Sequence, residues 1–297
     1  MRRLTTTDRD DRGGATVFIV VAITAVMIGV GFAIDVGQYV AAARSAQNTA
    51  DATALAVATD CALTGAPNAD YSPYRKPGQT ISSPACGSGE ATITATKDVD
   101  GLFLQQSAGD VDRTATARWG TIAGANVLPI VIADCEWDRA LLDGTSDITL
   151  TLDHPRPGGN CAPELAGGFS RLDGGTCSVP VSTGSLADGQ PGGALQQDEG
   201  CYNPLPQVVL IPMYDTVHCE ECMGQGPYLI SGIAAFRLTG YVLNGNRAEG
   251  SLSAGCPGLG PGPPPMCIRG DFIEWTTSQG NTGPSTDFGV TQVYLYS

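Results

Sequence analysis

The residues best able to do chemistry are two cysteines beside a histidine, in the stretch HCEEC at 218–222. A CxxC pair can be redox-active when a helix N-terminus lowers its thiolate pKa. Cys219, Cys222 and His218 could also supply three zinc ligands. The redox interpretation needs a helix directly after the pair, but the sequence that follows, MGQGPY, is typical of a turn. The zinc interpretation needs further ligands, but the only other histidine in the sequence is His154. We expect a structural disulfide in a hairpin loop and keep the other two readings as alternatives.

Two further motifs could bind a partner or a metal ion. RGD at 269–271 matches an integrin-binding tripeptide, but it reads equally as a turn before the strand DFIEW, and we expect the turn. DVDG at 98–101 resembles the start of a calcium loop, yet from Leu102 onward the spaced oxygen ligands are missing. No phosphate-cradling loop, HExxH or GxSxG occurs. We therefore expect no catalytic residue, metal site, cofactor or small-molecule substrate.

The chain holds ten cysteines, and all of them follow a long apolar run near the N-terminus. An even number on one side of a membrane-length segment predicts disulfides in an oxidising compartment, with ten reduced cytosolic thiols as the alternative. The short loop at 256–267 is worth roughly 3 kcal/mol when closed, in the chain-entropy model. The pairs we expect are Cys256–Cys267, Cys61–Cys86, Cys135–Cys161 and Cys177–Cys201, with Cys219 and Cys222 left over. Spacing leaves the six cysteines from Cys135 to Cys222 open to other connectivities.

Charge and composition exclude some classes of protein. Acidic residues outnumber basic ones by 30 to 16, which gives a formal net charge of −14. An acidic chain repels phosphate backbones, and no Lys/Arg-rich stripe occurs, so we expect no nucleic-acid partner. The 39 glycines and 20 prolines, with few aromatic residues, favour a loop-rich extracellular domain over a compact cytosolic enzyme.

Residues 15–34, ATVFIVVAITAVMIGVGFAI, form a run of 20 residues without a charge. As a helix this run is about 30 Å long, the thickness of a hydrocarbon core. The 30 residues after it hold one basic side chain, Arg44, whereas four arginines precede it: Arg2, Arg3, Arg9 and Arg12. The positive-inside rule therefore predicts a cytoplasmic segment 1–14, a transmembrane span 15–34 and an extracytoplasmic remainder.

The helical pattern does not stop where the span ends. No Gly or Pro occurs between Gln38 and Leu63, so we expect one helix over 15–60, with 35–60 as its amphipathic continuation. The apolar face holds Val36, Ala43, Ala46, Ala50, Ala54 and Val57, and the polar face holds Arg44, Gln47, Asn48 and Asp51. A cleaved signal peptide is the alternative, because 31–33 resembles a small-x-small cleavage site, but continuity of the helix favours a retained span.

Four residues of this helix are candidates for a role in assembly. Asp35 is either an interfacial stop for the span or a pairing partner inside a membrane contact. Gly37 belongs to a ridge of small residues that would let helices approach closely, although Ala/Gly-rich segments produce such ridges by chance. Gln47 and Asp51 lie four residues apart and could bond to each other, bond to the outer domain or face solvent. The ridge is Ala25, Gly29, Ala33, Gly37 and Ala41.

The remainder of the chain, 61–297, reads as a β-rich domain. Alternating β-branched and apolar residues predict eight strands, at 91–96, 113–119, 126–137, 146–152, 207–217, 228–243, 271–277 and 290–297. A long Gly/Pro-rich loop is expected over 154–206, and no second helix is expected. The predicted fold class is α+β, with a long N-terminal transmembrane and amphipathic helix followed by a disulfide-stapled extracytoplasmic domain.

The Arg-Gly entry at 12–13, the span, the Asp-x-Gly at 35–37 and QNTADATALA at 47–56 form a recognisable pattern. In these parts the chain resembles the TadE/TadG-like proteins of the bacterial Tad (Flp) pilus assembly system. The strand, loop and strand at 91–120 are similar as well. Three later segments resemble TadG-like members from high-GC Gram-positive bacteria: GGFSRLDGGTC, VVLIPMYDTV and GPYLISGIAAFRLTGYVLNG.

The resemblance implies a pilin-like, non-catalytic envelope protein, membrane-anchored, that assists Tad pilus assembly or anchoring. Its partners would be the membrane and other pilus-assembly proteins or pilin-like helices. A cleaved type IV prepilin carries glutamate at the fifth residue after its glycine, whereas counting from Gly14 gives Ile19, and the DxSxS metal motif of longer members is missing. The alternatives are an exported adhesin that uses the helix only as an anchor, and an extracytoplasmic thiol oxidoreductase.

Overall fold

The computed structural model describes residues 12–99, 109–151, 169–172, 177–190, 201–217, 227–243, 247–256 and 266–296. Its longest element is the helix α1, Arg12–Thr64, which runs for 53 residues without a break and so measures about 80 Å. The helix ends in a left-handed cap, because Gly65 has a φ of 72° and donates its N–H to the Cys61 carbonyl at 3.0 Å. The predicted helix over 15–60 is confirmed, and it extends further at both ends.

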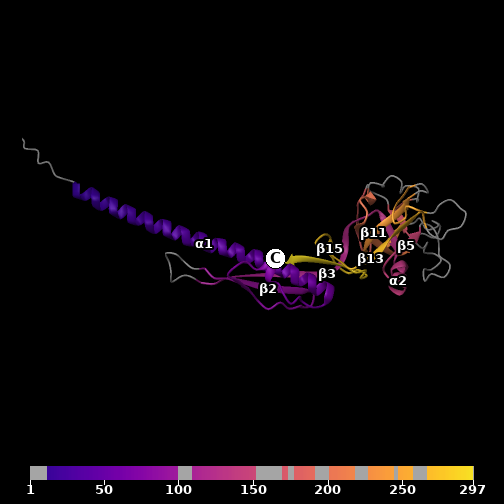
Figure 1. Ribbon diagram of the computed structural model, residues 1–297, viewed down its shortest axis with the longest axis horizontal. Coiled ribbons are helices and arrows are strands. Elements are labelled where there is room, and N and C mark those ends of the chain that lie inside the picture. The colour runs from indigo at the N-terminus through magenta and orange to yellow at the C-terminus, as the bar shows by residue number, and fades with distance from the viewer. Residues whose placement is uncertain are drawn as a thin grey trace, which may run out of the picture.

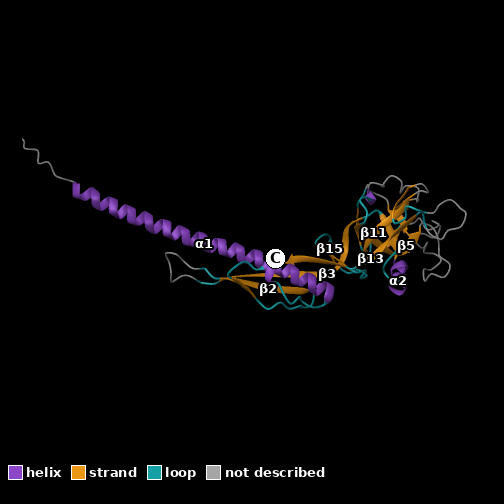
Figure 2. Cartoon of the chain, in the orientation of Figure 1, coloured by secondary structure: helices purple, strands orange, loops and turns teal. Residues whose placement is uncertain are grey.

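The second half of α1 lies along a seven-stranded sheet, while the first half projects away from it (Figures 1 and 2). The central path runs β1-β2-β3-β16-β14, and β7 and β15 pair with the far part of β3. A 3-10 turn, η1 (Ser72–Tyr74), precedes β1. The strands are β1 (Gln79–Ile81), β2 (Glu90–Lys97), β3 (Val111–Val127), β7 (Val179–Ser182), β14 (Trp275–Thr277), β15 (Asn281–Thr282) and β16 (Val290–Tyr296).

Period-two alternation explains how this sheet covers the helix with one face only. Along β2, Ala91, Ile93 and Ala95 are buried under α1, and the threonines between them point the other way. On that open face the hydroxyls of Thr92 and Thr94 lie 2.9 Å from those of Thr116 and Thr114, respectively, on β3. The sheet is therefore apolar toward the helix and polar toward solvent.

A nine-stranded sheet forms the far end of the molecule (Figure 1). Its path is β5-β13-β11-β10-β4-β6-β9, with β8 and β12 paired to β11. The hairpin of β10 and β11 has the bounds that the sequence predicts, and both faces of the sheet are buried in separate apolar clusters. The strands are β4 (Ile130–Ala133), β5 (Ile148–Thr151), β6 (Phe169–Leu172), β8 (Leu186–Ala187), β9 (Gly189–Gln190), β10 (Gln207–Val217), β11 (Tyr228–Leu243), β12 (Arg247–Gly250) and β13 (Cys267–Ile273).

The predicted strand over 126–137 is wrong in its second half, and with it the expectation of no second helix. The segment after β4 is the helix α2, Asp134–Asp143. Asp134 and Glu136 in its first turn complement the helix dipole. The ring of Trp137 packs edge-on against Phe272 at a centroid distance of 5.0 Å. A ten-residue helix directly after a buried strand is selected by this packing, which local periodicity does not reveal.

The predicted loop over 154–206 is also wrong in part, because its described residues include β6, β7, β8 and β9. Leu172, Val179 and Val181 are buried against the core of the larger sheet. These strands have only two to four residues each. The high Gly/Pro content of the region hides such short strands from a sequence pattern.

Three of the predicted disulfides are confirmed. Cys61–Cys86, Cys177–Cys201 and Cys256–Cys267 are bonded, at sequence separations of 25, 24 and 11. Cys135 is also disulfide-bonded, but its predicted partner Cys161 lies outside the described residues. The same holds for the HCEEC stretch with Cys219 and Cys222, and for His154. All cysteines within the described ranges are oxidised.

The RGD tripeptide lies inside β13 rather than in the expected turn. Arg269 makes a two-pronged ion pair with Asp147, with its Nε 2.6 Å from Oδ1. A side chain on Gly270 would collide with the carbonyl of Arg237 and the ring of Phe236. The segment pairs with β11 along its length. This pairing and the close approach at Gly270 give the tripeptide a structural role as part of a strand.

The ion pair makes acid stability depend on Asp147. The hydrogen bond from Arg269 holds the pKa of Asp147 below its usual 3.8, so the carboxylate form favours folding. This stabilisation is present above the unfolded-state pKa and is lost as the pH falls through the lower folded-state pKa. From about pH 5 to about pH 2, we expect the melting temperature of the wild type to drop further than that of Asp147→Asn in circular dichroism. Parallel acid curves for the two proteins would contradict this assignment.

Candidate functional site on the long helix

The second half of α1 is held on the first sheet by a face of small residues. Ala46, Ala50, Ala54 and Val57 are fully buried, as the predicted apolar face requires, and the last three belong to the apolar cluster around Ile93. Because alanines face alanines across this contact, the helix backbone lies close to the strands and leaves no room for larger side chains. Two members of the predicted face depart from it: Val36 is 45% exposed and Ala43 is only partly buried, since the sheet ends before them.

A buried glutamine fastens the start of this contact. Gln79 on β1, 6% exposed, accepts a hydrogen bond from the Thr49 hydroxyl at 2.6 Å. Its amide nitrogen donates to the Ser45 hydroxyl at 3.1 Å, and its carbonyl oxygen also accepts from the Lys76 backbone N–H at 3.0 Å. Sequence reasoning missed this group, because Gln79 lies 30 residues after its partner Thr49 and has no local signature.

We expect Gln79→Leu to lower the free energy of unfolding by about 1–3 kcal/mol, because it leaves three hydrogen-bonding groups without their partner. Denaturant unfolding of the full chain in detergent micelles would measure the change. Thr80→Val on the exposed face of the same strand is the matched control, with an expected change within about 0.5 kcal/mol. Equal effects of the two substitutions would contradict the role of Gln79.

The far end of the helix is fastened by a tyrosine and a disulfide. The Tyr71 hydroxyl donates to Asp60 at 2.8 Å and accepts from the Asn68 backbone N–H at 2.7 Å. Burial, with the hydrogen bond to Asp60, raises the pKa of Tyr71 to about 12, so its proton stays in place at neutral pH. Cys61 in the last turn is bonded to Cys86 before β2. The docked half of α1 is therefore fixed at both ends.

The first half of α1 has no such cover. Large apolar side chains are exposed all around it, among them Phe18 at 79%, Met27 at 66% and Ile28 at 68%. The helix reaches a mean hydropathy of 2.8 and is long and apolar enough to cross a membrane. Keeping such a surface in water is unfavourable by about 25 cal/mol per Å². This half therefore needs an apolar surrounding, and lipid or partner helices can provide it.

The four candidate assembly residues lie in two different places on the helix. Asp35 and Gly37 belong to the projecting half, where Asp35 is partly buried and a side chain at Gly37 would meet no atom within 4 Å. Gln47 and Asp51 lie on the docked half, and the Gln47 amide donates to Asp51 at 2.7 Å. The structure thus selects one of the three options for the latter pair, a bond to each other.

Within the described residues, no three His, Cys, Asp or Glu side chains gather in a group that could hold a metal ion. The most distinctive part of the chain is instead the helix itself, half docked and half exposed. Residues 13–60 match the model of the Tad family, described as Flp pilus-assembly TadE/G-like. In this segment the chain is similar to the TadE/TadG-like family. The match says nothing of the high-GC TadG-like subgroup, which stays a prediction.

The matched segment includes most of α1, from the exposed half to the docked half, and ends before either sheet. Comparison with curated proteins and with solved structures gave no match. The match associates residues 13–60 with Flp pilus assembly, and together with the apolar helix it supports a membrane-anchored protein. The similarity to known proteins therefore covers only the helix, and the β-rich part is interpreted from its own structure.

Proposed function

We propose that the protein is a pilin-like, non-catalytic membrane protein that assists the assembly or anchoring of a Tad-type pilus. The observation that carries the proposal is the single helix α1, which is exposed and apolar over its first half. Its second half is docked on the β-rich part of the chain, residues 61–297, which we call the head. A rigid connection of this kind transmits the position of the membrane segment to the head without an intervening hinge. Span 15–34 anchors the chain, and segment 35–60 carries the head.

The arginines before the span support an orientation with residues 1–14 in the cytoplasm and both sheets outside. Oxidised cysteines in the head agree with an extracytoplasmic location. Protease added to intact cells should then degrade the head and leave a membrane-embedded fragment. A head that is protected in intact cells would contradict this orientation.

In the membrane, the exposed face of the span packs against helices of other pilus-assembly proteins. Asp35 and Gly37 lie at its outer end, where a close helix contact and a carboxylate partner would meet. An adhesin that uses the helix only as an anchor is the second candidate, favoured by the large second sheet far from the helix (Figure 1).

Replacing residues 15–40 by an unrelated transmembrane helix separates the two functions, because it leaves the docked residues from Ser45 onward intact. The proposal expects normal protein levels in the membrane fraction but few or no pili by electron microscopy. Gly37→Leu should also reduce the number of pili. Val36→Leu is the control, because it lies at the neighbouring position and changes the size of the side chain less. Normal piliation with the foreign helix would favour the adhesin.

A further inference from the structure

The apolar surface of α1 continues beyond the charge-free run and ends just before the helix meets the head. Val36 is 45% exposed, Tyr39 is 48% exposed and Val40 is 41% exposed. Together with Phe32 they occupy positions i, i+4, i+7 and i+8, which lie on one face of a helix. Further along the chain this face is the docked one, where Ala46 is fully buried. The three exposed side chains, which we call the 36–40 stripe, therefore extend the docked face toward the span.

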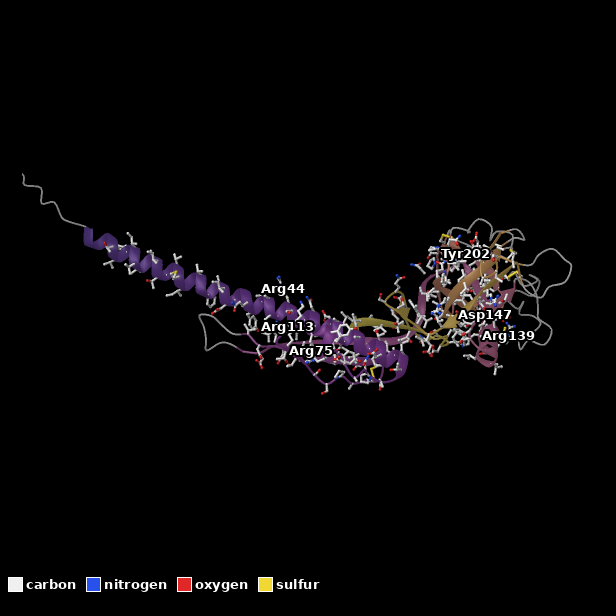
Figure 3. The ribbon with its side chains drawn as sticks, in the orientation of Figure 1. Arg44, Arg75, Arg113, Arg139, Asp147 and Tyr202 are labelled. Carbon is white, nitrogen blue, oxygen red and sulfur yellow. A yellow bond between two sulfur atoms is a disulfide. The ribbon has the colours of Figure 1, made fainter. Side chains whose placement is uncertain are left out.

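The head leaves nearly half of each of these side chains uncovered. Its hydrogen bond to the start of the docked half joins Gln79 to Ser45, and Arg44, one residue earlier, projects from α1 at this level (Figure 3). In the described part of the chain the Tyr39 hydroxyl has no hydrogen-bond partner. Apolar surface in water is unfavourable by about 25 cal/mol per Å², so the 36–40 stripe needs another cover.

The depth of the stripe corresponds to the outer headgroup layer. With Ile34 as the edge of the hydrocarbon core, the Cα atoms of Val36 and Tyr39 lie about 3 Å and about 7.5 Å outside it. The headgroup layer of one leaflet is about 5–7 Å thick. Helical side chains lean toward the N-terminus of their helix, which for α1 is the membrane side. When the span occupies the membrane, the ring of Tyr39 therefore lies within the headgroup layer, whereas Ser45, about 16 Å outside the edge, remains in water.

We propose that Tyr39 is the interfacial residue that fixes the depth of α1 in the outer leaflet. Its ring packs among the glycerol groups, its hydroxyl donates a hydrogen bond to a phospholipid ester oxygen, and Val36 contacts the acyl chains below it. Tyrosine suits this boundary because one end of its side chain is apolar and the other is polar. Continuity of the stripe with the exposed Phe32 in the span favours lipid over a protein partner as its cover. The proposal rests on the membrane anchoring proposed above.

Tyr39→Trp in full-length protein, reconstituted into phosphatidylcholine vesicles, tests this depth. The native tryptophans Trp119, Trp137 and Trp275 all lie in the head, so the wild type gives the background emission. Bromine atoms quench an indole by contact, and they are placed either near the headgroup end or near the methyl end of the acyl chain. We expect the emission gained with the substitution to fall about twofold with bromine near the headgroup end, and by less with bromine near the methyl end.

Tyr74→Trp is the matched control, because Tyr74 is 45% exposed but lies beside Tyr71, which is bonded to Asp60. Asp60 lies about 39 Å beyond Ile34 along the helix, so neither brominated lipid should quench the indole introduced there. A spin label at Ile34, carried by a genetically encoded ketone amino acid, reports the depth of the helix. Tyr39→Ala should raise its collision with a water-soluble nickel complex about twofold, and Tyr39→Trp should leave that collision unchanged.

Flotation of the same vesicles separates this proposal from the anchoring. Wild type and variants should all float, because the span anchors them. Absence of quenching at position 39 in protein that floats would mean that water or protein covers the stripe, and would overturn the interfacial role alone. Stronger quenching by bromine near the methyl end would place the residue inside the hydrocarbon core and would also overturn it, as would unchanged nickel collision with Tyr39→Ala. Protein that fails to float would overturn the anchoring and with it the interfacial role.

Discussion

Aspartate in place of Ala54 should detach the long helix from its sheet and lower the free energy of unfolding by more than about 3 kcal/mol. Ala54 is completely buried, with 0% of its surface accessible to solvent. Ile93, Ala95 and Ala117 belong to the same apolar cluster and offer no cation or donor. A carboxylate there would remain unpaired in an apolar contact.

Asn48→Asp is the matched control, because it adds the same charge on the exposed side of the same helix, within two turns. Its free energy of unfolding should change by no more than about 0.5 kcal/mol. Ala54→Leu provides a second variant without a charge, with an expected loss of about 1–3 kcal/mol from overpacking. All three substitutions are measured by denaturant unfolding of the full chain in micelles. If Ala54→Asp were as stable as Asn48→Asp, the docking of α1 on the sheet would be wrong.

Loss of the Cys61–Cys86 disulfide is the second large effect. The bond closes a segment of 25 residues, which corresponds to about 3.5 kcal/mol in the chain-entropy model. We expect the double variant Cys61→Ser, Cys86→Ser to lose stability of that size. Hydrogen exchange should also increase first in the last turns of α1, because Cys61 is 5% exposed and joins the helix end to the sheet.

The corresponding double variant at Cys256 and Cys267 is the control, since that bond closes a segment of only 11 residues. Its expected loss is about 2.8 kcal/mol, and it should leave hydrogen exchange in α1 unchanged. Faster exchange in α1 from both double variants, or from neither, would show that the first disulfide does not fasten the helix end.

The helix could be predicted from the sequence because it depends on local information. Its 3.6-residue period and the lack of Gly or Pro between Gln38 and Leu63 can be read directly from the sequence. The buried positions Ala46, Ala50 and Ala54 follow from that period. The hairpin of β10 and β11 was equally accessible, since both strands are long, apolar and adjacent in sequence.

Features that depend on distant residues could not be predicted in this way. The C-terminal strand β16 returns to pair with β3 across more than 160 positions, and Gln79 becomes a buried partner of Thr49 only once both elements are in place. The helix α2 is selected by contacts of Trp137 with Phe272 and Phe288.

The central claim is that one unbroken helix joins the lipid to the head. Spin labels carried by a genetically encoded ketone amino acid avoid the native cysteines and can be placed singly at Val20, Ile28, Asn48 and Leu63 in full-length protein in lipid vesicles. Collision with oxygen and with a water-soluble nickel complex is then measured. The account predicts that labels at Val20 and Ile28 meet oxygen and not nickel, and that labels at Asn48 and Leu63 meet nickel. Nickel access at Val20 or Ile28 would contradict it.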